Sequence, residues 1–356
     1  MNLLESVEQT LGTALGRGST LWPPAHLSLA LQGGGSFGAF TWGVLDRLLE
    51  SGDVDLDTVS GASAGAVNAV LLADGLAAGG RDGAREKLAH FWERLSRNAA
   101  FGPFGSTAHF APGGAAGTFS AWARLLSPYQ YNPLDVNPLR TLINEEIDFE
   151  RLKASSPIRL LIAATRVSDG RARIFGNAEI NADVVLASSC LPLFHHAVTI
   201  DNTAYWDGGY SANPPLIDLV SASQATDLLV VRITPMLSAE TPTSSREILR
   251  RLDQITFNAS LQTELETLER QIDRSQKLTG LLSSESRKLR RLAIHQISAE
   301  EAFDGLADAN ATNLDWNFLT TLRDHGRTAA AAWLAGKKAS NMVPQTAAPL
   351  EASYAP

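Results

Sequence analysis

Ser63 is the residue of this chain whose setting most clearly suggests chemistry. It stands in the pattern Gly61-Ala-Ser63-Ala-Gly65, after the strand candidate VDLDTVS and before a helical stretch. A serine on a sharp strand-to-helix turn is held in a strained conformation with its hydroxyl exposed, and flanking glycines permit the tight approach. The start of the following helix favours a developing negative charge. The pattern is therefore typical of an acyl-transfer nucleophile, although GxSxG sequences also occur in ordinary turns.

An acyl-transfer serine also needs backbone N–H groups directed at the oxyanion. The run GGGSFG, residues 33–38, follows the apolar strand candidate HLSLALQ. In a parallel sheet, sites gather at the carboxyl ends of the strands, so this run and Ser63 are expected at the same edge. The candidate oxyanion and substrate-binding residues are Gly33, Gly34, Gly35, Ser36 and Gly38.

The same run also matches the dinucleotide-binding pattern GxGxxG. That motif requires an acidic residue about 20 residues later, after the second strand. This chain has SGASAG at that place, with Ser63 where the ribose-binding acid would stand. The sequence therefore favours an oxyanion loop over a dinucleotide loop.

The third candidate group is the carboxylate of Asp207 in the sequence YWDGGY. Gly208 and Gly209 permit a tight bend that would turn this carboxylate inward, where it could serve as the base that a nucleophilic serine needs. An Asp-Gly turn is also common in surface loops. Asp207 becomes a candidate because it occurs together with Ser63 and the glycine run.

Together, the glycine run, the GxSxG turn and the Asp-Gly-Gly turn resemble the patatin-like phospholipase family, over roughly residues 26–233. The resemblance implies an α/β fold with three α/β/α layers and a mostly parallel central sheet. It implies a dyad without histidine, in which Ser63 is the nucleophile and Asp207 the general base. The N–H groups of Gly34, Gly35 and their neighbours would form the oxyanion hole. The substrate would be a lipid or fatty-acyl ester, and no cofactor would be needed.

One residue departs from the family's pattern. Many members place Arg or Lys before the last glycine of the loop, and this chain has Phe37. If that cation attracts phosphate headgroups, this protein would prefer a less anionic lipid or simple esters. The departure leaves the substrate open.

Two other functions remain open. A Ser-His-Asp esterase would need a histidine after the acid, and His295 and His325 qualify by order, but neither lies on an evident strand-end loop. His195 and His196 precede Asp207 and fit a local packing or capping role better. A non-catalytic lipid-binding protein on the same fold is the other alternative.

The order of expected elements predicts four parts. They are an N-terminal segment (1–24), the acyl hydrolase domain (25–235), a mainly helical C-terminal extension packed on it (236–339) and a disordered tail (340–356). Strands are expected in 158–175 as a hairpin, in 227–233, and in 291–297. A long helix is expected over 243–275. The apolar stretch 99–120 is a candidate lid or acyl-groove wall, because long irregular loops are uncommon unless functional.

Composition narrows the class of protein. The chain has 356 residues, 44% of them hydrophobic, and a net charge of -8, which argues against a nucleic-acid binder. Cys190 is the single cysteine, so no intramolecular disulfide can form. The sequence contains no uninterrupted apolar run of about 18 residues, so no transmembrane helix is expected. It also lacks histidine, cysteine and carboxylate residues at the spacings typical of metal sites. We expect a cytoplasmic protein, with peripheral membrane contact possible.

The cationic stretch SRKLRRL, residues 286–292, is either a solvated face or a contact for anionic lipid. The oligomeric state is left open.

Overall fold

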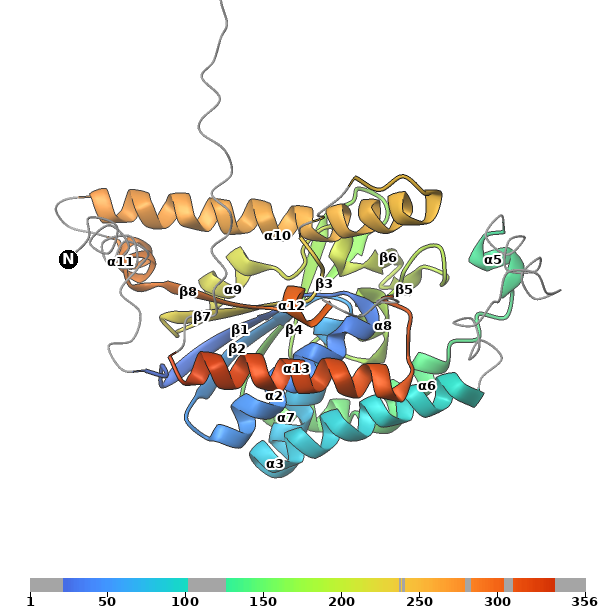
Figure 1. Ribbon diagram of the computed structural model, residues 1–356, viewed down its shortest axis with the longest axis horizontal. Coiled ribbons are helices and arrows are strands. Elements are labelled where there is room, and N and C mark those ends of the chain that lie inside the picture. Colours follow the sequence, from blue (N-terminus) through green and yellow to red (C-terminus); the bar gives the residue numbers. More distant parts are fainter. Residues whose placement is uncertain are drawn as a thin grey trace, which may run out of the picture.

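A single mixed sheet forms the centre of the molecule (Figure 1). The computed structural model describes residues 22–101, 126–236, 238, 241–278, 283–303 and 310–336. In this part of the chain the sheet has eight strands: β1 (His26–Leu31), β2 (Asp55–Gly61), β3 (Arg159–Arg166), β4 (Ala172–Gly176), β5 (Val198–Ile200), β6 (Thr203–Asp207), β7 (Asp227–Arg232) and β8 (Ala293–Ser298).

The strand order is β5-β6-β3-β2-β1-β7-β8, and β4 also pairs with β3. The neighbours from β3 to β8 in this order run parallel, whereas β4, β5 and β6 join by antiparallel pairing. The mostly parallel sheet and the predicted hairpin within 158–175 are thus confirmed. β1 lies between β2 and β7, and its side chains after His26 are buried, as the apolar run required.

Helices cover both faces of the sheet (Figure 1). They are α2 (Gly38–Ser51), α3 (Ala64–Phe101), α5 (Pro128–Tyr131), α6 (Pro138–Glu146), α7 (Phe149–Ser155), α8 (Ala182–Ser188), α9 (Leu216–Ala222), α10 (Ser245–Lys277), α11 (Ser284–Arg291), α12 (Glu300–Phe303) and α13 (Trp316–Leu334), with short 3-10 turns η1 (Gly35–Phe37) and η3 (Gly208–Tyr210). α3 is interrupted by non-helical backbone at Gly79 and Gly80 and therefore consists of two helices, one on either side of these glycines.

The apolar core is divided by the sheet. The larger cluster joins β1, β2 and β3 to α2, α3 and α13, and includes Leu29, Phe40 and Leu319. The second cluster lies on the other face, where Leu261 and Leu265 of α10 pack with residues of α9 and β7. This arrangement gives the three α/β/α layers that the family resemblance implies.

The C-terminal part of the chain belongs to the sheet as well as to the helical layers. β8 adds a parallel strand next to β7, which confirms the strand expected in 291–297. α13 packs closely against α2 at Gly43 and Gly326. The approach is possible only because these residues lack side chains: Cβ atoms there would overlap the backbone carbonyl groups of Arg323 and Phe40. Side-chain hydrogen bonds cap the start of each helix, from Ser244 for α10 and from Asp315 for α13.

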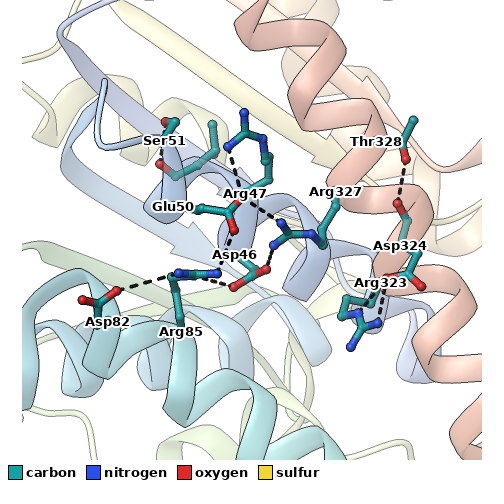
Figure 2. A network of polar contacts seen from close by, with 11 residues as sticks. Asp46, Arg47, Glu50, Ser51, Asp82, Arg85, Arg323, Asp324, Arg327 and Thr328 are labelled. Carbon is teal, nitrogen blue, oxygen red and sulfur yellow. Dashed lines mark hydrogen bonds and ion pairs between the residues drawn. The ribbon is translucent and has the colours of Figure 1, made fainter.

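Ion pairs at the surface connect α2 to α3 and to α13 (Figure 2). Arg85 of α3 contacts Asp46 at 2.8 Å and Glu50 at 3.0 Å, both on α2. Arg327 of α13 reaches the same two carboxylates, with a distance of 2.7 Å to Glu50. Such partly exposed pairs individually contribute little to stability, but the network fixes α13 beside the helix that follows the glycine run.

Three expectations fall outside the described residues. These are most of the N-terminal segment 1–24, most of the candidate lid 99–120, and the tail 340–356. The division of the chain into four parts stays a prediction.

Candidate active site

Ser63 occupies the turn between β2 and α3. Its φ is 54°, in the left-handed region that non-glycine residues seldom adopt. The turn depends on both flanking glycines. A Cβ atom on Gly61 would lie 2.6 Å from the carbonyl of Gly65, and one on Gly65 would overlap the carbonyl oxygen of Leu31. Backbone strain of this kind costs about 1–3 kcal/mol and is concentrated at functional sites.

The strained turn is anchored from α8. The N–H of Ser63 donates to the carbonyl oxygen of Ser188 and to its hydroxyl, both at 3.0 Å. α3 begins at Ala64, directly after the serine. The Ser63 side chain is therefore fixed at the positive end of a helix dipole, where a developing anion is favoured.

Asp207 ends β6 and is fully buried. Its N–H donates to the carbonyl of Cys190 at 2.8 Å, and its Oδ1 accepts the N–H of Gly209 at 2.7 Å. Burial raises the pKa of the Asp207 carboxyl to about 7, against the lowering effects of hydrogen bonds from Ser63 and Gly209. This carboxyl therefore titrates near neutral pH, as suits a general base.

The structure brings Ser63 and Asp207 together. The Ser63 hydroxyl is close enough to lower the pKa of Asp207, yet Oδ2 of this carboxylate makes no well-aligned hydrogen bond to any described residue. Catalytic hydrogen bonds are often long or poorly aligned in sites without substrate. Gly208 and Gly209 are required for this arrangement, since Cβ atoms there would overlap the backbone of Ala163 and the ring of Phe257.

The glycine run lies against Ser63. A Cβ atom on Gly33 would be 2.7 Å from the Cβ of Ser63. The N–H of Gly33 is occupied, because it donates to Oδ1 of Asn213 at 2.7 Å.

The remaining N–H groups of the run divide into engaged and free ones. The N–H of Ser36 donates to the Ala311 carbonyl at 2.8 Å, and that of Gly38 bonds to carbonyls of η1. Within the described part of the chain, the N–H groups of Gly34 and Gly35 have no acceptor. These two groups are therefore the candidate oxyanion donors, and the other three candidates of the run, Gly33, Ser36 and Gly38, serve its conformation.

Phe37, which stands where a cation was expected from the family pattern, is buried. Its ring centroid lies 6.5 Å from that of Phe318 on α13. This position of the run is thus held by apolar packing on the C-terminal helix.

The four candidate histidines of the sequence have other partners or surroundings than Ser63 and Asp207. His295, on the edge strand β8, bonds at 2.9 Å to Asp227 on the neighbouring strand β7. His325 is exposed on α13. His196 stacks on Tyr129 with a centroid distance of 4.1 Å, and burial lowers the pKa of the neighbouring His195. Among the described residues, none of these histidines is hydrogen-bonded to the serine or to the aspartate.

The cationic cluster 286–292 coincides with α11. Lys288 bonds to the carbonyls of Ser221 and Ser223, and Arg290 bonds to the Ser275 carbonyl at 2.6 Å. Ser223 precedes β7, so this end of α11 lies at the amino-terminal edge of the parallel strands, opposite the edge that carries Ser63. Two of the cations thus cap backbone carbonyls within the molecule.

In the described ranges, no helix is long and apolar enough to span a membrane. The same ranges contain no group of three or more His, Cys, Asp or Glu residues arranged to hold a metal ion.

Comparison with known proteins identifies relatives at the level of a family. The model of patatin-like phospholipases matches residues 29–220. No curated protein matches the chain significantly. The crystal structure of VipD from Legionella pneumophila is similar with a TM-score of 0.42 and 15% sequence identity, covering 91% of this chain and 70% of VipD. The type III effector protein ExoU is similar with a TM-score of 0.33 and 16% identity, covering 89% of this chain and 54% of ExoU. Both structural similarities are too distant to bear on activity.

Proposed function

The chain belongs to the patatin-like phospholipase family, and we propose that it is a serine acyl hydrolase that cleaves carboxylic esters of lipids with Ser63 and Asp207. The observation that carries this proposal is the strained Ser63, with φ of 54°, next to a fully buried carboxyl whose pKa is about 7. Acyl transfer by a serine requires a base next to the nucleophile, and such a base is most effective when its pKa lies near the working pH.

In the proposed reaction, Asp207 accepts the proton of Ser63 as the serine Oγ attacks the ester carbonyl carbon. The N–H groups of Gly34 and Gly35 hold the resulting oxyanion. The carbon–oxygen bond to the alcohol then breaks, the alcohol leaves with the proton from Asp207, and the acyl group remains on Ser63 as an ester. Water, deprotonated by Asp207, attacks this ester. The fatty acid departs, and the proton returns from Asp207 to Ser63.

The proposal is tested by hydrolysis of water-soluble p-nitrophenyl esters and by labelling with a fluorophosphonate. The probe should form an Oγ–phosphorus bond at Ser63 with loss of fluoride, and mass spectrometry of the peptide should place it there. Absence of both turnover and labelling in the folded protein would favour the non-catalytic lipid-binding alternative.

Activity is expected to rise with pH through about 7. Asp207 accepts a proton only as a carboxylate, and burial holds its pKa at about 7 instead of the ordinary 3.8. The measurement is kcat/KM for a soluble ester from pH 5 to pH 9, which reports the ionisation of the free enzyme. A profile that is flat above pH 5 would show that the essential base is an ordinary, solvated carboxylate.

Exposed apolar side chains near the site are consistent with a lipid substrate. Leu193 and Phe194 are 78% and 53% exposed, on the turn three residues after Cys190, whose carbonyl binds the N–H of Asp207. The hydroxyl of Tyr131 bonds to the carbonyl of Phe194 at 2.7 Å and supports this turn. Exposed apolar groups beside a site mark a surface for an apolar ligand or a lipid interface.

We therefore expect the double substitution L193E/F194E to reduce hydrolysis of phosphatidylcholine vesicles about tenfold, because each side chain loses part of the roughly 1.5–3 kcal/mol available from burial in lipid. Hydrolysis of a short water-soluble ester should be unchanged. Leu278→Glu is the matched control, since Leu278 is 48% exposed at the opposite, C-terminal end of α10. Equal losses on both substrates would contradict a role in lipid contact.

A further inference from the structure

We infer that the C-terminal part of the chain, beyond residues 29–220 of the family match, positions the oxyanion loop through Ser36 and Asn213. This inference rests on the function proposed above. Among the described residues, the N–H groups of Gly34 and Gly35 have no acceptor, and they lie between two tied positions. On one side Ser36 bonds directly to the turn before α13, and on the other side Gly33 bonds to Asn213, which in turn bonds to α10.

The far end of the loop is tied to the turn that precedes α13. Ser36 is 2% exposed. Its N–H donates to the carbonyl of Ala311 at 2.8 Å, and its hydroxyl donates to the carbonyl of Asn310 at 3.0 Å. The preceding Gly35 has φ of 59°, and a Cβ atom there would overlap the Ala311 carbonyl oxygen. The turn is therefore packed directly on the peptide that carries one candidate donor.

The near end of the loop is tied to α10 by way of Asn213. This side chain is fully buried, and its Oδ1 accepts the Gly33 N–H at 2.7 Å. Its Nδ2 donates to the carbonyl of Phe257 at 2.8 Å, and its own N–H donates to the hydroxyl of Ser260 at 3.1 Å. Asn213 thus connects the helix α10 to the loop, close after the Asp207 turn.

These ties matter because the loop cannot fix its own conformation. Glycines have no side chains to pack and reach more backbone conformations than other residues. Oxyanion donors act only when they are directed at the developing charge within a few tenths of an ångström. Ser36 and Asn213 are accordingly positioning residues, which act through the peptides of Gly34 and Gly35.

The test compares Ser36→Ala and Ser260→Ala with Ser28→Ala. Ser28 is a matched control because it is also 2% exposed and loses a buried hydroxyl hydrogen bond, at 2.6 Å to Ser223, in the amino-terminal half of β1. Ser260→Thr keeps the hydroxyl and serves as the conservative variant. The readouts are the rate constant for fluorophosphonate labelling of Ser63, its pH midpoint, and the unfolding temperature of the full chain.

We expect Ser36→Ala and Ser260→Ala to label about tenfold more slowly, less than the roughly 100-fold loss from removing a donor outright. The pH midpoint should stay where it is, and Ser260→Thr should restore the rate. Ser28→Ala should lose stability but label at the wild-type rate. Wild-type labelling rates in both test variants would overturn this inference but leave the proposed function standing. A wild-type protein that does not label would refute the proposed function, and the inference with it.

Discussion

Ser63→Ala is expected to lower kcat/KM for ester hydrolysis by about 10⁴-fold or more and to abolish fluorophosphonate labelling. Removing the nucleophile of a serine hydrolase leaves only the catalysis that substrate binding and the oxyanion donors provide. The fold should remain, because the N–H of Ser63, and not its hydroxyl, makes the anchoring bonds to Ser188. Stopped assays with soluble ester and a thermal unfolding curve measure both effects.

Ser63→Gly provides the control for backbone strain. Both variants lack the nucleophile, but alanine at φ of 54° keeps the left-handed strain and glycine relieves it. Relief of about 1–2 kcal/mol, partly offset by the greater flexibility of unfolded glycine, should make Ser63→Gly the more stable variant. If Ser63→Ala retains more than a hundredth of the wild-type activity, another residue is the nucleophile.

The glycine run and Ser63, which each directly follow a strand, were predictable from the sequence. The apolar run that becomes β1, the glycines after it and the second strand before Ser63 each have local patterns. Parallel strands then bring their carboxyl ends to one edge. Local pattern and sheet topology together were sufficient to place Gly33 near Ser63, since β1 and β2 are neighbours.

The ties that hold the loop were not predictable. Asn213 belongs to the run DGGYSANPP, which by sequence is only a turn, and its partner Gly33 lies 180 residues earlier. The carbonyls of Asn310 and Ala311 have no side-chain signature at all. Contacts made by backbone groups across such separations follow from tertiary packing alone.

The long helical pattern over 243–275 shows another limit. The helix formed as expected, as α10, and Leu261 and Leu265 are buried. Ile248 and Leu252 repeat at the same helical spacing but are 41% and 53% exposed. A helix of 33 residues is about 50 Å long, whereas six-residue strands span about 20 Å. One sheet cannot cover the whole helix, and periodicity does not say which half it covers.

Asp207→Asn is expected to remove activity and at the same time to stabilise the protein at alkaline pH. Without a carboxylate, Ser63 has no base, and kcat/KM should fall by about 10³-fold or more. The amide can still accept the N–H of Gly209, which Oδ1 accepts at 2.7 Å in the wild type. The change therefore removes a buried charge without removing the turn.

The stabilisation follows from the raised pKa of Asp207. In the unfolded chain the carboxyl releases its proton near 3.8, whereas the folded protein holds it up to about 7. Between these values the folded state binds more protons, so its stability falls as the pH rises, by about 4 kcal/mol for a difference of about three pH units. Well below pH 3.8 both states are protonated and the penalty is absent, and at pH 4 only a small part of it has developed. Asp207→Asn should therefore be close to the wild type in stability at pH 4 and clearly more stable than the wild type at pH 8.

Asp57→Asn gives a control of opposite sign. Burial acts to raise the pKa of Asp57, but hydrogen bonds from Ser223, Gln224, Thr58 and Ala225 outweigh it and leave the pKa lowered. This carboxylate therefore stabilises the fold above pH 3.8, and that contribution is lost as the pH falls through its lowered pKa. Urea unfolding at pH 4 and pH 8 should show Asp57→Asn less stable than the wild type at pH 8, and Asp207→Asn more stable. If Asp207→Asn is instead destabilised at pH 8, the Asp207 carboxylate is well solvated or paired in the folded protein, and its role as a base poised near neutrality is refuted.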